Sequence, residues 1–207
     1  MQIIKQTNKI FPCITCISDK LSEHPALIIQ LHGAGERGNG KDELNKVTVH
    51  GFMNVVNDSN FNDCILVMPQ CPQETFWVAK IESLKKFIDD IIKEYNIDKN
   101  RIYLCGISMG GYGTWNTAMA YPDMFAAIAP CCGGGAEWSA CRLQMPVWAF
   151  HGLEDDAVLP SRTIDMVNKL RETNPNVKCT LYEGVGHNCW EKAFSDELLE
   201  WLLAQHK

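Results

Sequence analysis

The feature that most constrains this chain is a glycine-flanked serine between an apolar run and a helix-like stretch. The run 101–105 is followed by a G-x-S-x-G pattern at 106–110, and helix-compatible residues come next. In this pattern a strand turns sharply into a helix and holds its serine in a strained conformation, so the flanking positions must be small. Gly106 and Gly110 meet that requirement. The pattern predicts that Ser108 is a nucleophile on a strand-to-helix elbow.

Short apolar runs alternate with longer amphipathic segments along the whole chain. This alternation is typical of an α/β fold with a mostly parallel central sheet and helices on both faces. We expect strands at 13–18, 26–31, 64–68, 101–105, 125–130, 147–150 and 178–182, and helices at 80–95, 109–121, 161–173 and 189–205.

Length and charge limit the remaining choices. The 207 residues contain no repeat or linker, which predicts a single catalytic domain over 1–207. A net charge of −6 without a Lys/Arg cluster argues against nucleic acid as a partner. No apolar window is long enough for a membrane span, and the N-terminus is a poor signal peptide, so we expect a cytoplasmic protein without a membrane partner. Whether the chain forms a homo-oligomer stays open.

Ten cysteines are many for a chain of this length. Cys13 and Cys16 form a CxxC pattern, and Cys131 and Cys132 are adjacent. Without an export signal, we expect reduced thiols that serve as small core residues. A CxxC without a second CxxC or a nearby histidine pair is weak evidence for zinc, so no metal is expected.

A nucleophilic serine needs a base that takes its proton and an acid that orients the base. In this architecture the chain order is serine, then acid, then histidine. Downstream of Ser108, the strand at 147–150 leads into Glu154, Asp155 and Asp156, three carboxylates at the edge where open α/β sheets place their sites. The strand at 178–182 then leads into a glycine-rich loop that ends at His187.

His187 is the candidate base by chain order. Three other histidines precede the serine, namely His24, His32 and His50. His206 lies in the tail, and His151 lies at a strand end, where we expect it to shape the turn that carries the acid.

The developing oxyanion of a tetrahedral intermediate needs hydrogen-bond donors. We expect one from the backbone N–H of Met109 and a second from Ala34, in the glycine-rich loop after the strand at 26–31. The same loop partly matches two nucleotide-binding patterns. No helix follows it, however, and Asp42 stands where a magnesium-binding Ser or Thr is required, so no cofactor is expected.

Five segments together resemble the small α/β-hydrolases described as phospholipase/carboxylesterase or predicted peptidase, relatives of dienelactone hydrolases and feruloyl-type esterases. They are LHGAGERG (31–38), MPQCP (68–72) with Trp77, IDKNRIYLCGISMGGYGTW (97–115), FHGLEDDAVLP (150–160) and GHNCW (186–190). The resemblance covers residue 26 to the C-terminus. It implies an α/β-hydrolase fold with a Ser108–Asp155–His187 triad, because Asp155 holds the fifth position of an H-G-x-x-D-x-x-V pattern. The chain departs from that pattern at Leu159.

Too few residues separate the strand at 125–130 from Pro146 for a large lid, so a shallow cleft open to water is expected. Trp77, Trp138 and Trp190 fall in loops near the expected catalytic edge and are candidates to wall the cleft, although each could equally be core.

The leading hypothesis is a serine carboxylesterase that acts on a small-molecule ester through an acyl-serine intermediate. A serine peptidase or a thioesterase with the same triad is the alternative. From another class, the chain could be a non-catalytic hydrolase fold, or a thiol or metal-binding protein built on Cys13 and Cys16. The complete set of nucleophile, base, acid and oxyanion loop argues against that class.

Overall fold

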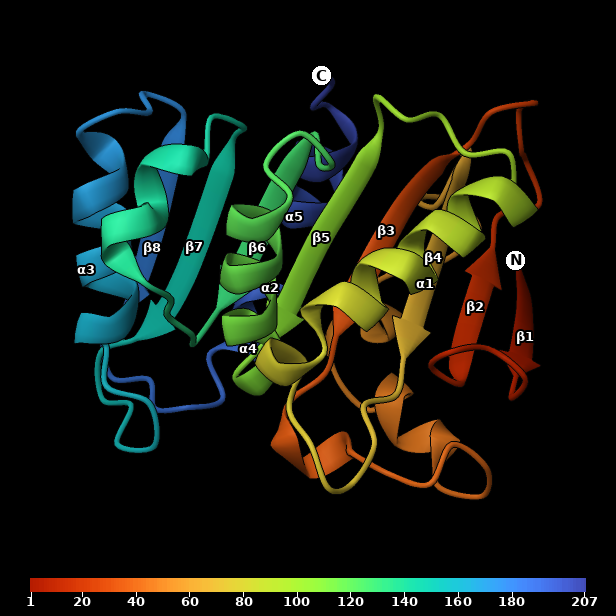
Figure 1. The fold of residues 1–207 in the computed structure, drawn as a ribbon, viewed down its shortest axis with the longest axis horizontal. Helices are drawn as coiled ribbons and strands as arrows, with labels where there is room; N and C mark the ends of the chain where they lie inside the picture. The colour runs from red at the N-terminus through yellow and green to blue at the C-terminus, as the bar shows by residue number, and fades with distance from the viewer.

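A single eight-stranded sheet runs through the molecule (Figure 1). The computed structural model describes residues 1–207, and its strands lie in the order β1-β2-β4-β3-β5-β6-β7-β8. Their bounds are β1 Gln2–Gln6, β2 Cys13–Ile17, β3 Ala26–Leu31, β4 Cys64–Pro69, β5 Ile102–Ile107, β6 Ala127–Cys131, β7 Val147–Gly152 and β8 Val177–Tyr182. β2 pairs antiparallel with β1 and with β4, and all other neighbours are parallel. The predicted mostly parallel sheet is confirmed.

Helices cover both faces of the sheet, as predicted. Figure 1 shows α1 and α2 in front of the sheet and α5 behind it. The helices are α1 Ile81–Glu94, α2 Met109–Ala120, α3 Ser161–Arg171, α4 Trp190–Ala193 and α5 Asp196–Leu203. Short 3₁₀ helices lie at Ala34–Glu36, Leu44–Thr48, Gly51–Asn54, Trp77–Ala79 and Glu137–Arg142. None of these helices has the length and the apolar character that a bilayer span requires.

Two apolar cores, one on each face, explain why the strands have this sequence. Every residue of β3, β4 and β5 is buried, as expected for parallel strands covered on both sides. Alternate residues enter opposite cores: Leu27 packs with α1, α2 and α3, and Ile28 packs with α5. Because both faces of the sheet are packed, the ends of its strands, and the loops that follow them, have fixed positions.

The structure differs from the sequence prediction at both ends of the chain. β1 was not expected, because Gln2–Gln6 is a largely exposed edge strand without clear alternation. The single helix predicted at 189–205 is wrong, since α4 and α5 are separate helices. Phe194 between them is extended and packs edge-on against Phe52 at 4.9 Å, and the Ser195 hydroxyl accepts the Leu198 N–H to begin α5.

The carboxyl ends of the parallel strands meet along one edge, the lower edge in Figure 1. β5 ends one residue before Ser108, β7 ends three before Asp155, and β8 ends five before His187. The topology therefore brings the three predicted residues to one place.

Candidate active site

Ser108 lies on a strained turn between β5 and α2. Its backbone angles are φ 54° and ψ −114°, a left-handed φ that non-glycine residues rarely adopt. A Cβ on Gly106 would collide with the Gly110 carbonyl, and a Cβ on Gly110 would collide with the Leu31 carbonyl. The sequence places glycine at both positions because α2 passes against β5 and β3 with no room for a side chain.

Three side chains from three loops form a continuous hydrogen-bonded chain. Ser108 Oγ lies 2.9 Å from His187 Nε2, and His187 Nδ1 lies 2.7 Å from Asp155 Oδ2. An ionised carboxylate accepts the Nδ1–H, which leaves Nε2 free to accept the serine proton. The His187 side chain is 26% exposed and that of Asp155 is 0% exposed, so the base faces solvent while the acid is enclosed.

The surroundings of Asp155 keep its carboxylate ionised. Its Oδ1 accepts the N–H groups of Ala157 at 3.0 Å and Val158 at 2.8 Å. Burial raises the pKa of Asp155, but the hydrogen bonds from His187 and from these amides outweigh it, and the pKa lies below its ordinary value. The adjacent Glu154 and Asp156 are exposed. The structure brings Asp155 to His187, as the resemblance implied, despite Leu159.

His151 shapes the turn that carries this acid, as expected from its position. Its Nε2 lies 2.8 Å from the Val158 carbonyl and 3.1 Å from Asp155 Oδ2. Its Nδ1 lies 2.7 Å from the Thr163 hydroxyl of α3. The fully buried ring thus ties the end of β7 to the turn and to α3.

The two expected oxyanion donors belong to the first residues of helical segments. Ala34 begins a 3₁₀ helix and Met109 begins α2, so neither N–H has an acceptor within its own helix. Ala34 lines the same cavity as Ser108. Both amides therefore lack a partner within their helices, and Ala34 lies in the wall of the cavity that holds Ser108.

A buried histidine holds the Ala34 loop in place. His32 Nδ1 donates to the Gly33 carbonyl at 2.6 Å, and its Nε2 accepts the Cys71 N–H at 2.9 Å. Burial lowers the pKa of His32 to about 4, so the ring is neutral at physiological pH. The indole N–H of Trp77 donates to the His32 carbonyl at 3.0 Å.

Of the three candidate tryptophans, only Trp190 lines the cavity at Ser108. Its ring lies edge-on to His187 with centroids 5.2 Å apart, and 5.5 Å from the ring of His50. The structure does not bring Trp77 to the cavity, because its side chain is fully buried and bonded to the His32 carbonyl. Trp138 is 75% exposed on the 3₁₀ helix Glu137–Arg142 and is not brought to the cavity.

The cavity has a volume of about 250 Å³ and includes two polar side chains that the sequence analysis missed. His50 was considered only as a base, and chain order excluded it from that role. Glu36 follows the glycine-rich loop, and its position there was the only signal available. Both lie beside Ser108 and His187 in the cavity wall.

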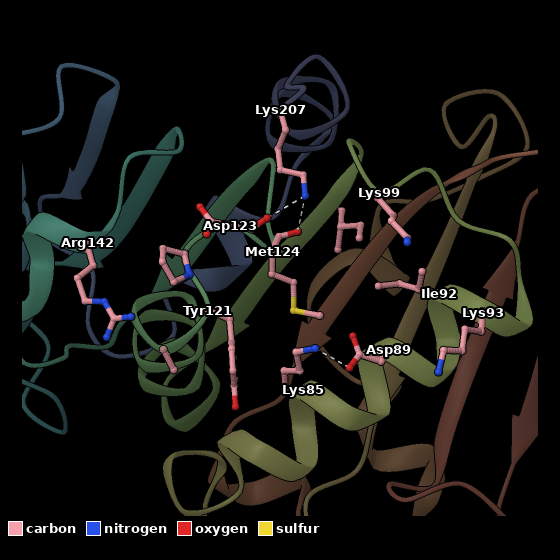
Figure 2. A pocket seen from close by; sticks show the side chains of 13 residues that line it. Lys85, Asp89, Ile92, Lys93, Lys99, Tyr121, Asp123, Met124, Arg142 and Lys207 are labelled. Atoms are coloured by element: carbon pink, nitrogen blue, oxygen red, sulfur yellow. Dashed lines mark hydrogen bonds and ion pairs between the residues drawn. The ribbon is translucent and has the colours of Figure 1, made fainter.

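A larger cavity, of about 750 Å³, lies elsewhere, between α1 and the far end of α2 (Figure 2). Basic side chains surround it, and Lys85 pairs there with Asp89 at 2.6 Å. No serine, cysteine or histidine lines it. Since α2 begins beside Ser108, this cavity is about one helix length, roughly 18 Å, from the hydrogen-bonded trio.

The CxxC cysteines do not lie together. Cys13 packs in the core with α1, whereas Cys16 packs in the core on the other face. Residues three apart on a strand point to opposite faces, so these two thiols cannot act on one ligand.

A mostly parallel sheet that carries serine, aspartate and histidine in this order on its carboxyl edge defines an α/β-hydrolase fold. More specifically, the chain belongs to the dienelactone hydrolase family, whose model matches residues 14–197.

Three proteins that are similar to this chain are named as esterases. The chain is 41% identical over 91 residues to a bifunctional acetylxylan esterase/xylanase of Neocallimastix patriciarum, covering 43% of this chain and 12% of that protein. It is 30% identical over 135 residues to feruloyl esterase B of Neurospora crassa, covering 59% of this chain and 46% of that protein. A solved thermostable esterase superposes with a TM-score of 0.86 at 29% identity, covering 100% of this chain and 63% of the other. The chain thus spans less than half the length of both curated relatives.

Proposed function

We propose that this chain is a serine carboxylesterase that works through an acyl-serine intermediate. The observation that carries the proposal is the hydrogen-bonded chain Ser108–His187–Asp155 on a strained elbow. The names of the relatives support the same reaction class.

In the first half of the reaction, His187 Nε2 takes the proton of Ser108 as Oγ attacks the ester carbonyl. The ionised Asp155 stabilises the imidazolium that forms. The oxyanion of the tetrahedral intermediate accepts hydrogen bonds from the N–H groups of Ala34 and Met109. The imidazolium then protonates the leaving alcohol, and water repeats the sequence on the acyl-serine.

The dimensions of the cavity favour a short or planar acyl group. Its volume of about 250 Å³ lies below the range of cavities that enclose drug-sized ligands. The flat ring of Trp190 beside His187 suits an acetyl group or a planar aromatic acyl group such as a hydroxycinnamoyl. The alcohol part of the substrate would remain outside the cavity, which allows a bulky leaving group such as a sugar.

A panel of matched substrates tests the proposal. An aryl acetate, an acetylated xylo-oligosaccharide and methyl ferulate are compared with an amide and a thioester of the same acyl groups, all in the presence of EDTA. We expect the esters to be hydrolysed and Ser108→Ala to lose about a million-fold in kcat. Faster cleavage of the amides would indicate a peptidase, and preferential cleavage of the thioesters would indicate a thioesterase; either result would overturn the carboxylesterase assignment.

A further inference from the structure

Three buried thiols meet directly behind the catalytic histidine. Cys131 ends β6, Cys132 follows it, and Cys189 is the residue from which α4 begins. The sulfur of Cys189 lies 2.8 Å from that of Cys132 and 3.4 Å from that of Cys131, and all three residues are fully buried.

The backbone is bent to bring the adjacent pair together. Successive side chains of a strand point to opposite faces, which would separate Cys131 from Cys132. Cys132 instead has a φ of 50°, in the left-handed region, so both thiols reach the same side and lie 3.8 Å apart. A left-handed non-glycine residue costs about 1–2 kcal/mol, which the surrounding packing must offset.

The residues of this thiol cluster lie next to all three members of the hydrogen-bonded trio. The Ser108 N–H donates to the Cys131 carbonyl at 2.9 Å. The Cys132 thiol donates to the His187 carbonyl at 3.2 Å, and its sulfur lies within 4.8 Å of His151 and Asp155. Cys189 is two residues after His187. A new bond within the cluster would therefore break the contact between Cys132 and the His187 backbone.

The protonation states of the three cysteines indicate which reaction the cluster can undergo. A hydrogen bond from the Cys131 thiol lowers the pKa of Cys189, while burial raises the pKa of Cys131. The result is one nucleophilic sulfur beside two protonated thiols. Formation of a disulfide removes the thiolate charge and adds none next to the buried carboxylate of Asp155.

We propose that Cys189 and Cys132 form an oxidation site at which a small peroxide reversibly inactivates the enzyme. The Cys189 thiolate attacks one oxygen of hydrogen peroxide, the O–O bond breaks, and, with one proton taken up, a sulfenic acid and water form. The Cys132 sulfur then attacks the sulfenic acid and a second water leaves. Two thiols lose two electrons and two protons, and the peroxide is reduced to two waters.

The disulfide would disturb the hydrogen-bonded trio. Bond formation brings the two sulfurs from 2.8 Å to about 2.05 Å and removes the thiol hydrogen bond to the His187 carbonyl. Because a misplacement of about 1 Å can cost on the order of a hundredfold in rate, a loss of that size is expected. The loss of activity rests on the proposed function, whereas formation of the disulfide does not.

The test uses the full chain carrying Cys141→Ala, which removes the one exposed thiol. The protein is treated with hydrogen peroxide in EDTA and examined by peptide mass mapping without reduction, alongside ester hydrolysis. We expect a peptide pair joining Cys132 to Cys189 and a fall in activity of roughly a hundredfold that dithiothreitol reverses. Cys189→Ala should form no such pair, and the matched control Cys179→Ala, outside the cluster, should form it normally.

Each other outcome has a defined meaning. Unlinked Cys132 and Cys189, or sulfinic acid at Cys189 without a cross-link, would overturn the oxidation site. Stoichiometric zinc or copper in the purified protein that is lost in Cys189→Ala would show a metal site instead. A cross-link without loss of activity would overturn the switch. A cross-link in a protein that hydrolyses no ester even when reduced would uphold the oxidation site and refute the proposed function.

Discussion

At the scale of single residues, Asp155 and Asp156 are chemically identical neighbours whose side chains point in different directions from the same turn. Asp155 is enclosed and accepts hydrogen bonds from His187 and from two backbone amides. Asp156 is exposed. The proposed mechanism needs the first carboxylate and makes no use of the second.

Asp155→Asn should therefore lower kcat about ten-thousand-fold, because an amide favours the wrong tautomer of His187. Asp156→Asn should cost tenfold or less, like the loss of a surface charge. Steady-state kinetics on both variants measure the difference, and thermal melts check that neither has unfolded. The reverse ranking would mean that Asp156 is the acid.

Trp190 offers a second test at this scale. Its indole N–H is buried and has no acceptor, so the ring acts through its shape and its edge-on contact with His187. Trp190→Phe should keep kcat/KM within about threefold, whereas Trp190→Ala should lower it about tenfold, since an aromatic pair contributes up to ~1.4 kcal/mol beyond its buried area. Kinetics with an aryl acetate measure both. Equal losses would indicate that the substrate uses the N–H.

At the scale of elements, the site depends on how closely α2 crosses the strands beneath it. Gly110→Ala would push a methyl group into the Leu31 carbonyl, which belongs to the backbone of β3 and cannot move freely. We expect a loss of at least 1–3 kcal/mol in the free energy of unfolding, the usual cost of overpacking.

Gly35→Ala is the matched control for stability, because its Cβ would have nothing within 4 Å and its φ is not left-handed. Its free energy of unfolding should change by about 0.5 kcal/mol or less. Urea denaturation compares the two variants. Equal stabilities would show that α2 does not press on β3 as described.

The elements also show what sequence alone could predict. The buried strands were found because parallel strands covered on both faces consist of continuous apolar runs. β1 was missed because its pairing with β2, and not its own pattern, makes it a strand. The break before α5 was missed although Ser195, followed by Asp196 and Glu197, is a recognised start signal. The break was overlooked because apolar residues recur at helical spacing through 189–205.

At the scale of the whole molecule, chain order predicted which side chains meet, because the carboxyl ends of parallel strands share one edge. Contacts that depend on how loops fold over one another could not be predicted in this way. Trp77 lies beneath the loop of His32, 45 residues away in sequence. The thiol cluster joins Cys132 to Cys189, 57 residues apart, and the left-handed φ of Cys132 has no sequence signal.

The buried His32 makes the stability of the molecule depend on pH. Its pKa is about 4 in the folded protein and 6.5 ordinarily, so between these values the unfolded chain binds more protons. The stability that the folded protein gains by keeping His32 neutral is complete above pH 6.5. It is lost as the pH falls toward 4, by roughly 3 kcal/mol in total.

His32→Gln removes the titrating ring but can still accept the Cys71 N–H. Urea denaturation at pH 4.5 and 7 should show a smaller difference in the free energy of unfolding for the variant than for the parent. An unchanged difference would mean that other groups carry the pH dependence.

The central claim is that Ser108 is the nucleophile and that His187 activates it. The most direct measurement is labelling with a fluorophosphonate, which bonds covalently to an activated serine, followed by peptide mass mapping. The account predicts one adduct, on Ser108, that is absent in Ser108→Ala and forms far more slowly in His187→Ala. An adduct on another serine, or none on the folded, unmodified protein, would contradict it.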